Sequence, residues 1–158
     1  MAPHPIRVAM ERRDVDAVLQ WFAPGFVLRS PVTGTPFTGT DSHRLLRSVL
    51  ESYEHWECVA EFGDEQELVL MTETRIGGRE VGVVDHLRFG PEGTVVAFTG
   101  YARPLDGAAT FARVVAPKIA GQRSRSRQVL VAALTRPVPA IIHRADRLVS
   151  ALAAMHER

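Results

Sequence analysis

The sequence predicts an α+β fold, in which helices pack on one face of a curved, mostly antiparallel sheet. Helical patterns occupy the first third of the chain, and four strand-like segments joined by glycine-containing turns follow them. Helices in one run and hairpins in the next pack as separate layers, unlike alternating strand–helix units. An apolar helical pattern after Pro104 predicts additional C-terminal helices.

Length and composition indicate one globular domain with an appendage. The chain has 158 residues, of which 46% are hydrophobic and 23% charged, as is typical of a protein with an apolar core. The composition changes after Pro104. We therefore expect a domain over residues 1–105 and a helical extension over residues 106–158.

The first half of the chain is expected to contain two helical regions. Its elements are a helix over 6–22, a short strand over 26–30, a loop over 31–39 and a helix that Thr40 or Asp41 caps and that runs to about Tyr53. Asp14 can cap a second piece of the first helix, and Ala23-Pro24-Gly25 is expected to end it. The loop, PVTGTPFTG, is rich in Pro, Gly and Thr.

Four strands follow, at about 56–62, 67–76, 79–89 and 94–103. Asp85 lies in the middle of the third of these strands, on the side of the alternation that also carries Val83 and Leu87. Such a face normally turns toward a core, where a carboxylate is costly unless it is paired, hydrogen-bonded or protonated. Asp85 is therefore either a structural carboxylate, bonded to a loop amide or an arginine, or a polar group in a pocket.

The C-terminal third is expected to be helical over 108–120 and again over 129–134, with a polar connector, GQRSRSRQ, between the two. A last helix is expected from about Pro139 to His156. Its apolar stripe consists of Val138, Ile141, Ile142, Ala145, Leu148, Val149, Leu152 and Met155. This stripe must be buried, either on its own domain as a lid or against another subunit.

Charge and residue usage argue against several classes of function. The net charge of +1 gives no general reason to expect a nucleic-acid or membrane partner, and the basic RSRSR segment is typical of a solvated linker. No disulfide can form within the chain, because Cys58 is the only cysteine, and a cytoplasmic location is expected. The six histidines show no metal-binding spacing, so no metal and no cofactor are predicted.

Three strings of the sequence resemble the NTF2-like superfamily, which includes ketosteroid isomerase and the SnoaL-like proteins. They are RRDVDAVLQWFAPGFVLRSPV, TPFTG and VVDHLRFGPEGTVVAF. The resemblance covers about residues 5–105 and implies a conical fold with an apolar cavity. It also implies a homodimer formed through the outer face of the sheet. It does not by itself fix an activity, because one fold hosts many functions.

The closest of these strings are those of ketosteroid isomerase, and the resemblance can be followed residue by residue. Asp85 matches the family's neutral aspartic acid, which an apolar site keeps protonated. Ser30 stands where the family has its aspartate base, and Ile6 where it has a tyrosine. A supporting tyrosine of the third helix falls near Arg47. Because base and tyrosine are both missing, isomerisation by the family's mechanism is not expected.

The resemblance also selects the residues of the cavity. Its expected wall residues are Phe37, Val83, Leu87, Phe98 and Gly100. If Arg47 reaches the cavity, Asp85 is one half of an ion pair; if Arg47 points to solvent, Asp85 is a neutral acid. The predicted function is binding of a small apolar molecule, with isomerase, cyclase or dehydratase chemistry at Asp85 left open. The alternative is a non-catalytic interaction or oligomerisation module that uses the C-terminal helix.

Overall fold

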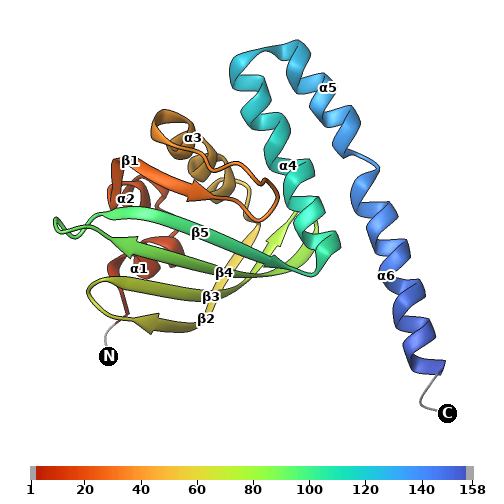
Figure 1. Ribbon diagram of the computed structural model, residues 1–158, viewed down its shortest axis with the longest axis horizontal. Helices are drawn as coiled ribbons and strands as arrows, with labels where there is room; N and C mark the ends of the chain where they lie inside the picture. The colour runs from red at the N-terminus through yellow and green to blue at the C-terminus, as the bar shows by residue number, and fades with distance from the viewer. Residues whose placement is uncertain (1–2, 156–158) are drawn as a thin grey trace.

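A five-stranded open sheet organises the protein (Figure 1). The computed structural model describes the backbone of residues 3–155 and the side chains of 3–121 and 124–147. The strands are β1 (Phe22–Arg29), β2 (His55–Gly63), β3 (Glu67–Ile76), β4 (Arg79–Phe89) and β5 (Val95–Arg103), in the spatial order β1-β5-β4-β3-β2. Only the β1–β5 pair of this sheet is parallel, so the sheet is mostly antiparallel, as the sequence predicts.

The four consecutive strands β2 to β5 lie within one residue of their predicted boundaries. Their alternation is unambiguous, and the turns between them contain glycine where the backbone requires it. Gly77 and Gly78 join β3 to β4 with φ of +56° and +74°, a conformation that residues with a Cβ rarely adopt. The residues in the turns and the alternation of apolar side chains therefore both predict the same strand boundaries along this part of the chain.

The N-terminal helical region is shorter than predicted. Helices α1 (Pro5–Glu11) and α2 (Val15–Leu19) are separate, and β1 begins at Phe22, where the sequence predicts the end of a helix. Asp14 caps α2 as expected, with its Oδ1 accepting from the backbone N–H of Ala17. Residues 23–25 do not end a helix. They lie within β1, where the pairing with β5 shifts register between Phe22 and Val27.

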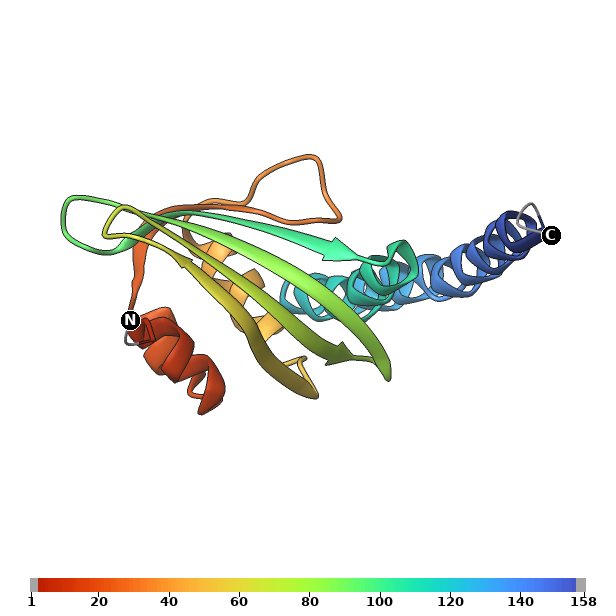
Figure 2. The same cartoon turned by 90° about the horizontal axis from the view of Figure 1, so that it is seen from below.

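Helix α3 (Gly39–Leu50) lies against the concave side of the sheet (Figure 2). It begins two or three residues earlier than predicted, with Thr38 in extended conformation as its N-cap, and Asp41 lies in its first turn. It also ends before Tyr53, at the cap residue Glu51. Leu45 and Leu46 of its apolar stripe are buried in the core, together with Phe26 of β1. This layer of helices on one sheet face is the predicted arrangement.

Three further helices follow in the described part of the chain: α4 (Leu105–Arg123), α5 (Arg125–Thr135) and α6 (Val138–Met155). The predicted connector over 121–128 is therefore wrong, because only Ser124 interrupts the helical backbone. The polar residues of this segment lie on the exposed surface of helices and not in a loop. No described helix has the length and apolar character needed to cross a bilayer.

Helix α4 packs as part of the core. Phe111 and Val115 are 6% and 2% exposed and belong to the same cluster as the sheet residues Val81 and Val83. The first helix of the predicted extension thus forms one wall of the domain, at the end of the sheet opposite α1 (Figure 1). The division at residue 105 remains a prediction from sequence.

Helix α6 differs most from expectation. Its described apolar residues Val138 and Ile141 are 39% and 63% exposed, so this part of the predicted stripe is not buried. Its contact with α4 is instead made beside His143, whose Nδ1 lies 2.9 Å from Oδ2 of Asp106. The stripe residues Leu148, Val149, Leu152 and Met155 lie outside the described side chains. The described part of α6 runs alongside α4 and does not cover the cone as a lid (Figure 1).

Candidate functional site

Asp85 lies at the centre of the concave face, as its place in the alternation predicts. It sits in the middle strand of the sheet, opposite Leu70 on β3 and Gly100 on β5. It is 9% exposed, and no hydrogen bond or ion pair joins it to another described residue. A Cβ at position 100 would lie 3.4 Å from its Oδ1, so Gly100 leaves room beside the carboxyl. The carboxyl oxygens are not fully enclosed, so a water molecule or a ligand can reach them.

Burial raises the pKa of Asp85 from its ordinary value of 3.8 to about 7. The alternative of a buried ion pair does not apply, because Arg47 is outside the cavity. Its guanidinium lies 2.5 Å from Asp16 and 3.6 Å from Glu51, and its side chain is 44% exposed. The prediction that Arg47 binds a ligand is therefore not supported by its position. Asp85 is protonated below neutral pH and can then donate a hydrogen bond.

Tyr53 is the site residue that the sequence interpretation misses. It follows the end of α3 and lines the same cavities as Asp85, whereas the expected tyrosine position falls near Arg47, on the exposed side of the helix. Burial, and then the proximity of Asp85, raise the pKa of Tyr53 well above its ordinary value. The signal available in the sequence is that Tyr53 is one of only two tyrosines and lies three residues after the helix end.

Two small cavities adjoin Asp85, each of about 30 Å³. Both are lined by Leu46, Val49, Tyr53, Asp85 and Phe98. Each holds about one or two water molecules at most, so the bottom of the cone is nearly filled. Asp85 and Tyr53 are the only ionisable side chains that line these two cavities among the described residues, and no base accompanies them.

A larger chamber of about 370 Å³ lies at the mouth of the cone, between α4, α5 and the loop after β1. It is lined by Ser30, Val32, Thr33, Phe37, Asp41, Leu45, Phe111, Ala112, Val115, Ala116, Ile119, Ala120, Arg127, Leu130 and Val131. We call it the outer chamber. Ser30, Leu45 and Phe111 also line one of the inner cavities, so these three side chains separate the chamber from Asp85. Its size and apolar lining suit a small apolar molecule.

The structure brings most of the predicted site residues together. Ile6 and Leu87 line one inner cavity, Ser30, Val83 and Gly100 line the other, Phe98 lines both, and Phe37 lines the outer chamber. Ser30 acts as a loop cap, since its Oγ accepts from the backbone N–H of Val32 at 3.3 Å. No described carboxylate or imidazole is hydrogen-bonded to Ser30 to replace the missing base. Of the predicted residues, only Arg47 lines none of these spaces.

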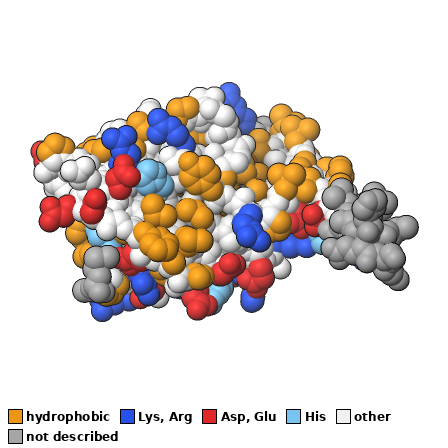
Figure 3. Space-filling view, turned by 60° about the horizontal axis from the view of Figure 1, so that its bottom comes forward, with side chains coloured by type: hydrophobic (Ala, Val, Ile, Leu, Met, Phe, Trp, Pro, Cys, Tyr) orange, Lys and Arg blue, Asp and Glu red, His pale blue; other side chains and the backbone are white. Residues whose placement is uncertain are grey.

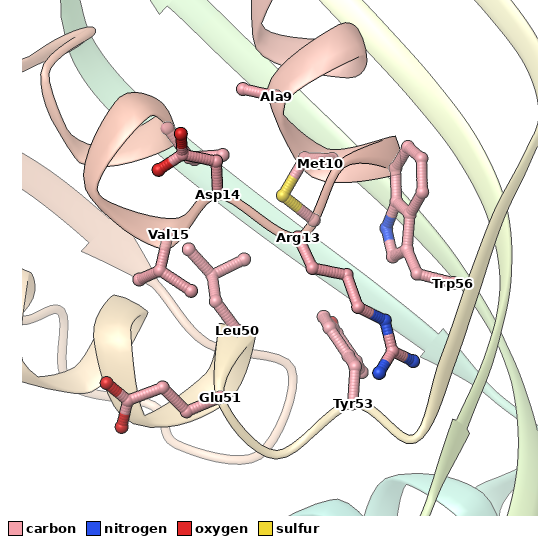
Figure 4. Close-up of a pocket in the computed structure, with 10 residues that line it drawn as sticks. Ala9, Met10, Arg13, Asp14, Val15, Leu50, Glu51, Tyr53 and Trp56 are labelled. Carbon is pink, nitrogen blue, oxygen red and sulfur yellow. The ribbon is translucent and has the colours of Figure 1, made fainter.

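A fourth space, of about 150 Å³, lies on the other side of Tyr53 and opens between α1, α2 and α3 (Figure 4). Arg13 and Trp56 line it together with Tyr53. The Nε1 of Trp56 is buried and has no hydrogen-bond partner among the described residues, whereas Arg13 donates to the backbone oxygen of Glu54. Asp14 and Glu51 also line this cleft, whereas Asp85 does not.

Several other polar residues form ion pairs on the outer face of the sheet. His86 and Arg88 both approach Glu67, at 3.2 and 3.6 Å. Arg75 of β3 pairs with Glu80 of β4. Among the described residues, no three His, Cys, Asp or Glu side chains gather as metal ligands would.

Known proteins with a similar fold help to interpret this geometry. No protein-family profile and no curated protein sequence matches the chain. Several solved structures are similar to it. A steroid delta-isomerase from Pseudomonas aeruginosa has a TM-score of 0.67 and 25% identity, with 75% of this chain and 88% of the isomerase covered.

Two structures of unknown function are similar at lower identity. A SnoaL-like protein from Burkholderia thailandensis has a TM-score of 0.50 and 20% identity, over 61% of this chain and 87% of the other. An NTF2-like protein from Cytophaga hutchinsonii has a TM-score of 0.51 and 12% identity, over 63% of this chain and 85% of the other.

These similarities and the sheet topology define the class of protein as an α+β cone with a cavity on the concave side of its sheet. More particularly, the chain has the fold of the NTF2-like superfamily, as the sequence resemblance implies.

Proposed function

We propose that the protein binds a small apolar molecule that carries an acceptor oxygen, with Asp85 as the hydrogen-bond donor. The observation that supports this proposal most strongly is the buried carboxyl of Asp85, which has no partner among the described residues and lies beside space that it shares with Tyr53. The apolar body of the ligand occupies the outer chamber. Its oxygen passes Phe111 and takes the place of water next to Asp85.

The similarity to a steroid delta-isomerase, together with the sequence resemblance to ketosteroid isomerase, supports a carbonyl compound as the ligand, because a ketosteroid carries a ketone oxygen. The reaction itself is not proposed, since Ser30 and Ile6 stand at the positions of base and tyrosine. In any chemistry at this site Asp85 acts as the acid or the donor to an oxyanion. A cytoplasmic location remains the expectation from the single Cys58.

A matched pair of probes tests the ligand proposal: 2-acetylnaphthalene, a ketone, and 2-ethylnaphthalene, which has a similar shape without the oxygen. Binding is measured by titration calorimetry at pH 5 and pH 8. We expect the ketone to bind about 3- to 10-fold more tightly at pH 5, because only protonated Asp85 donates. The hydrocarbon affinity stays constant. Equal binding of both probes at both pH values, or no binding of either, contradicts the proposal.

The protein is also proposed to form a homodimer through the outer face of the sheet. Ala60, Met71, Val84 and Tyr101 lie in one row across β2, β3, β4 and β5. Met71 and Tyr101 are 41% and 59% exposed, and hydrophobic side chains gather among charged ones on this side of the molecule (Figure 3). A row of apolar side chains with charged neighbours is typical of a protein interface. This face also supports the alternative function, a non-catalytic interaction module.

A further inference from the structure

The charge of the chain is divided unequally between its two parts. Residues 1–105 contain fifteen acidic and ten basic side chains, whereas residues 106–158 contain three acidic and nine basic ones. The small net charge of the whole chain conceals this difference. The expectation of no membrane partner rests on that net charge, so it does not apply to the C-terminal helices taken separately.

Helices α5 and α6, which we call the helical arm, present an exposed apolar face. Val129, Leu130 and Leu134 of α5 are 65%, 60% and 65% exposed, and Ile141 of α6 is 63% exposed. The arm runs beside α4 and away from the sheet (Figure 1). Single exposed apolar residues are normal on protein surfaces, but a row that continues from one helix to the next indicates contact with something else.

Arginines border this face on both sides. With about 100° between successive residues of a helix, Arg125 and Arg136 fall on one border of the Val129–Leu134 strip, and Arg127 falls on the other. All three are exposed, and none forms an ion pair with a described residue. Long basic side chains at the edges of an apolar helix face can reach the phosphates of a bilayer while the apolar residues enter it.

We propose that the helical arm binds the surface of an anionic lipid bilayer. A second copy of the chain is the competing partner, because residues 1–105, which we call the body, carry five more acidic than basic side chains, but several of these carboxylates are already paired within the body. Examples are Glu61 with Arg7, Glu67 with Arg88 and Glu80 with Arg75. Lipid phosphates, in contrast, carry the negative charge that the arm lacks, and acyl chains match its exposed leucines.

The arm lies next to the mouth of the outer chamber, since Arg127 and Leu130 belong to both. If the protein binds an apolar ligand as proposed above, the ligand can therefore pass between the bilayer and the chamber without crossing water. This consequence depends on that function, whereas bilayer binding by the arm does not.

Vesicle co-sedimentation of the full chain without added ligand tests the proposal. The vesicles contain about 30% phosphatidylglycerol in phosphatidylcholine, with pure phosphatidylcholine for comparison, at about 50 mM salt, where screening is weak. We expect binding to the anionic vesicles only. Arg125→Gln combined with Arg127→Gln should lower the partition about 10- to 30-fold, at roughly fivefold for each arginine. Leu134→Gln should lower it several-fold.

Matched variants on the body control for charge and for exposed apolar area. Arg12→Gln with Arg29→Gln removes the same charge, and Val59→Gln alters a residue that is 62% exposed, close to the 65% of Leu134. Both should bind vesicles as the unmodified protein does. The proposal is overturned if the unmodified protein does not bind anionic vesicles, or if the body variants lose binding equally. It is also overturned if the arm variants change only the self-association seen in sedimentation, which would identify a second copy as the partner.

Discussion

Asp85 combines three properties that rarely occur together: burial, the absence of a partner among the described residues and a place at the bottom of a cone. Burial raises its pKa to about 7, which means that the folded protein holds a proton that the unfolded chain does not hold between about pH 4 and pH 7. Folding therefore favours the neutral acid. The protein is most stable, with respect to this group, below its unfolded pKa, and loses that stability as the pH rises through about 7.

Replacing Asp85 by Asn should abolish this pH dependence. The amide keeps a donor and carries no charge, so Asp85→Asn should match the unmodified protein at pH 4 and exceed its stability at pH 8. At pH 8 the free energy of unfolding of the variant should exceed that of the unmodified protein by on the order of 4 kcal/mol, which corresponds to the shift in the pKa of Asp85. Urea unfolding across this pH range measures it, with the exposed Glu57→Gln as the control. A variant that is less stable at every pH would show instead that the carboxylate is structurally required.

Arg47 provides the opposite case, a residue whose role the structure revises. Its partner Asp16 has a side chain that is 76% exposed, and a pair of this kind contributes at most about 1 kcal/mol. Arg47→Met should therefore change the free energy of unfolding by less than this amount. It should also leave the pH dependence due to Asp85 unchanged. A large loss of stability in Arg47→Met, non-additive with that of Asp85→Asn in the double variant, would show instead that Arg47 and Asp85 form a buried ion pair.

The residue pattern alone predicts the site only where it lies on regular strands, whereas Ile6, Ser30 and Phe37 are placed by the family resemblance. The two-residue alternation of a strand fixes which side chains point inward, so Asp85, Val83 and Leu87 are placed correctly on one face. Tyr53 cannot be placed in the same way, because it follows the end of a helix and its direction depends on how α3 packs. Arg47 is misplaced for the same reason, since an error of one residue turns a helical side chain by about 100°.

At the scale of elements, Asp106 joins three parts of the fold. It lies in the first turn of α4 with a side chain that is 8% exposed, and its Oδ2 approaches Arg79 of β4 at 3.4 Å and His143 of α6 at 2.9 Å. This contact holds the described start of α6 against α4. The described stripe residues Val138 and Ile141, on which the sequence predicts docking, are exposed and do not make this contact.

Asp106→Asn should loosen α6 while α4 remains folded. The amide loses the ion pair with Arg79 and the carboxylate partner of His143, at a cost of about 1–3 kcal/mol for groups that are partly buried. Amide hydrogen exchange should accelerate in α6 and remain slow around Phe111 in α4. Asp146→Asn, an exposed change on α6 itself, serves as the control. Unchanged protection of α6 would show that other contacts hold the helix.

The elements are predicted best where local pattern and turn chemistry agree, as in β2 to β5. Prediction is wrong where tertiary pairing overrides local preference. Ala23-Pro24-Gly25 has the composition of a helix stop, yet pairing with β5 keeps it within a strand. The polar segment over 121–128 has the composition of a loop, yet packing of α4 against α5 keeps it helical.

At the scale of the whole molecule, the outer face of the sheet should mediate dimerisation. Met71→Lys places a charge in the centre of the apolar row and should convert the dimer to a monomer in analytical ultracentrifugation, because a buried unpaired charge costs several kcal/mol. Leu105→Lys, at a residue that is 69% exposed and outside this row, should leave the dimer intact. A dimer that survives Met71→Lys would have to use another surface.

The central claim is that Asp85 is a neutral acid that donates to the oxygen of a bound apolar molecule. It is tested most directly by the pKa of its carboxyl, followed by ¹³C nuclear magnetic resonance of aspartate side chains and assigned by the signal missing in Asp85→Asn. We predict a value of about 7 in the free protein. Saturation with 2-acetylnaphthalene should raise it further, because the ketone binds the protonated form, whereas 2-ethylnaphthalene should not raise it by hydrogen bonding. A pKa near the ordinary 3.8, or one that responds equally to both probes, would contradict the account.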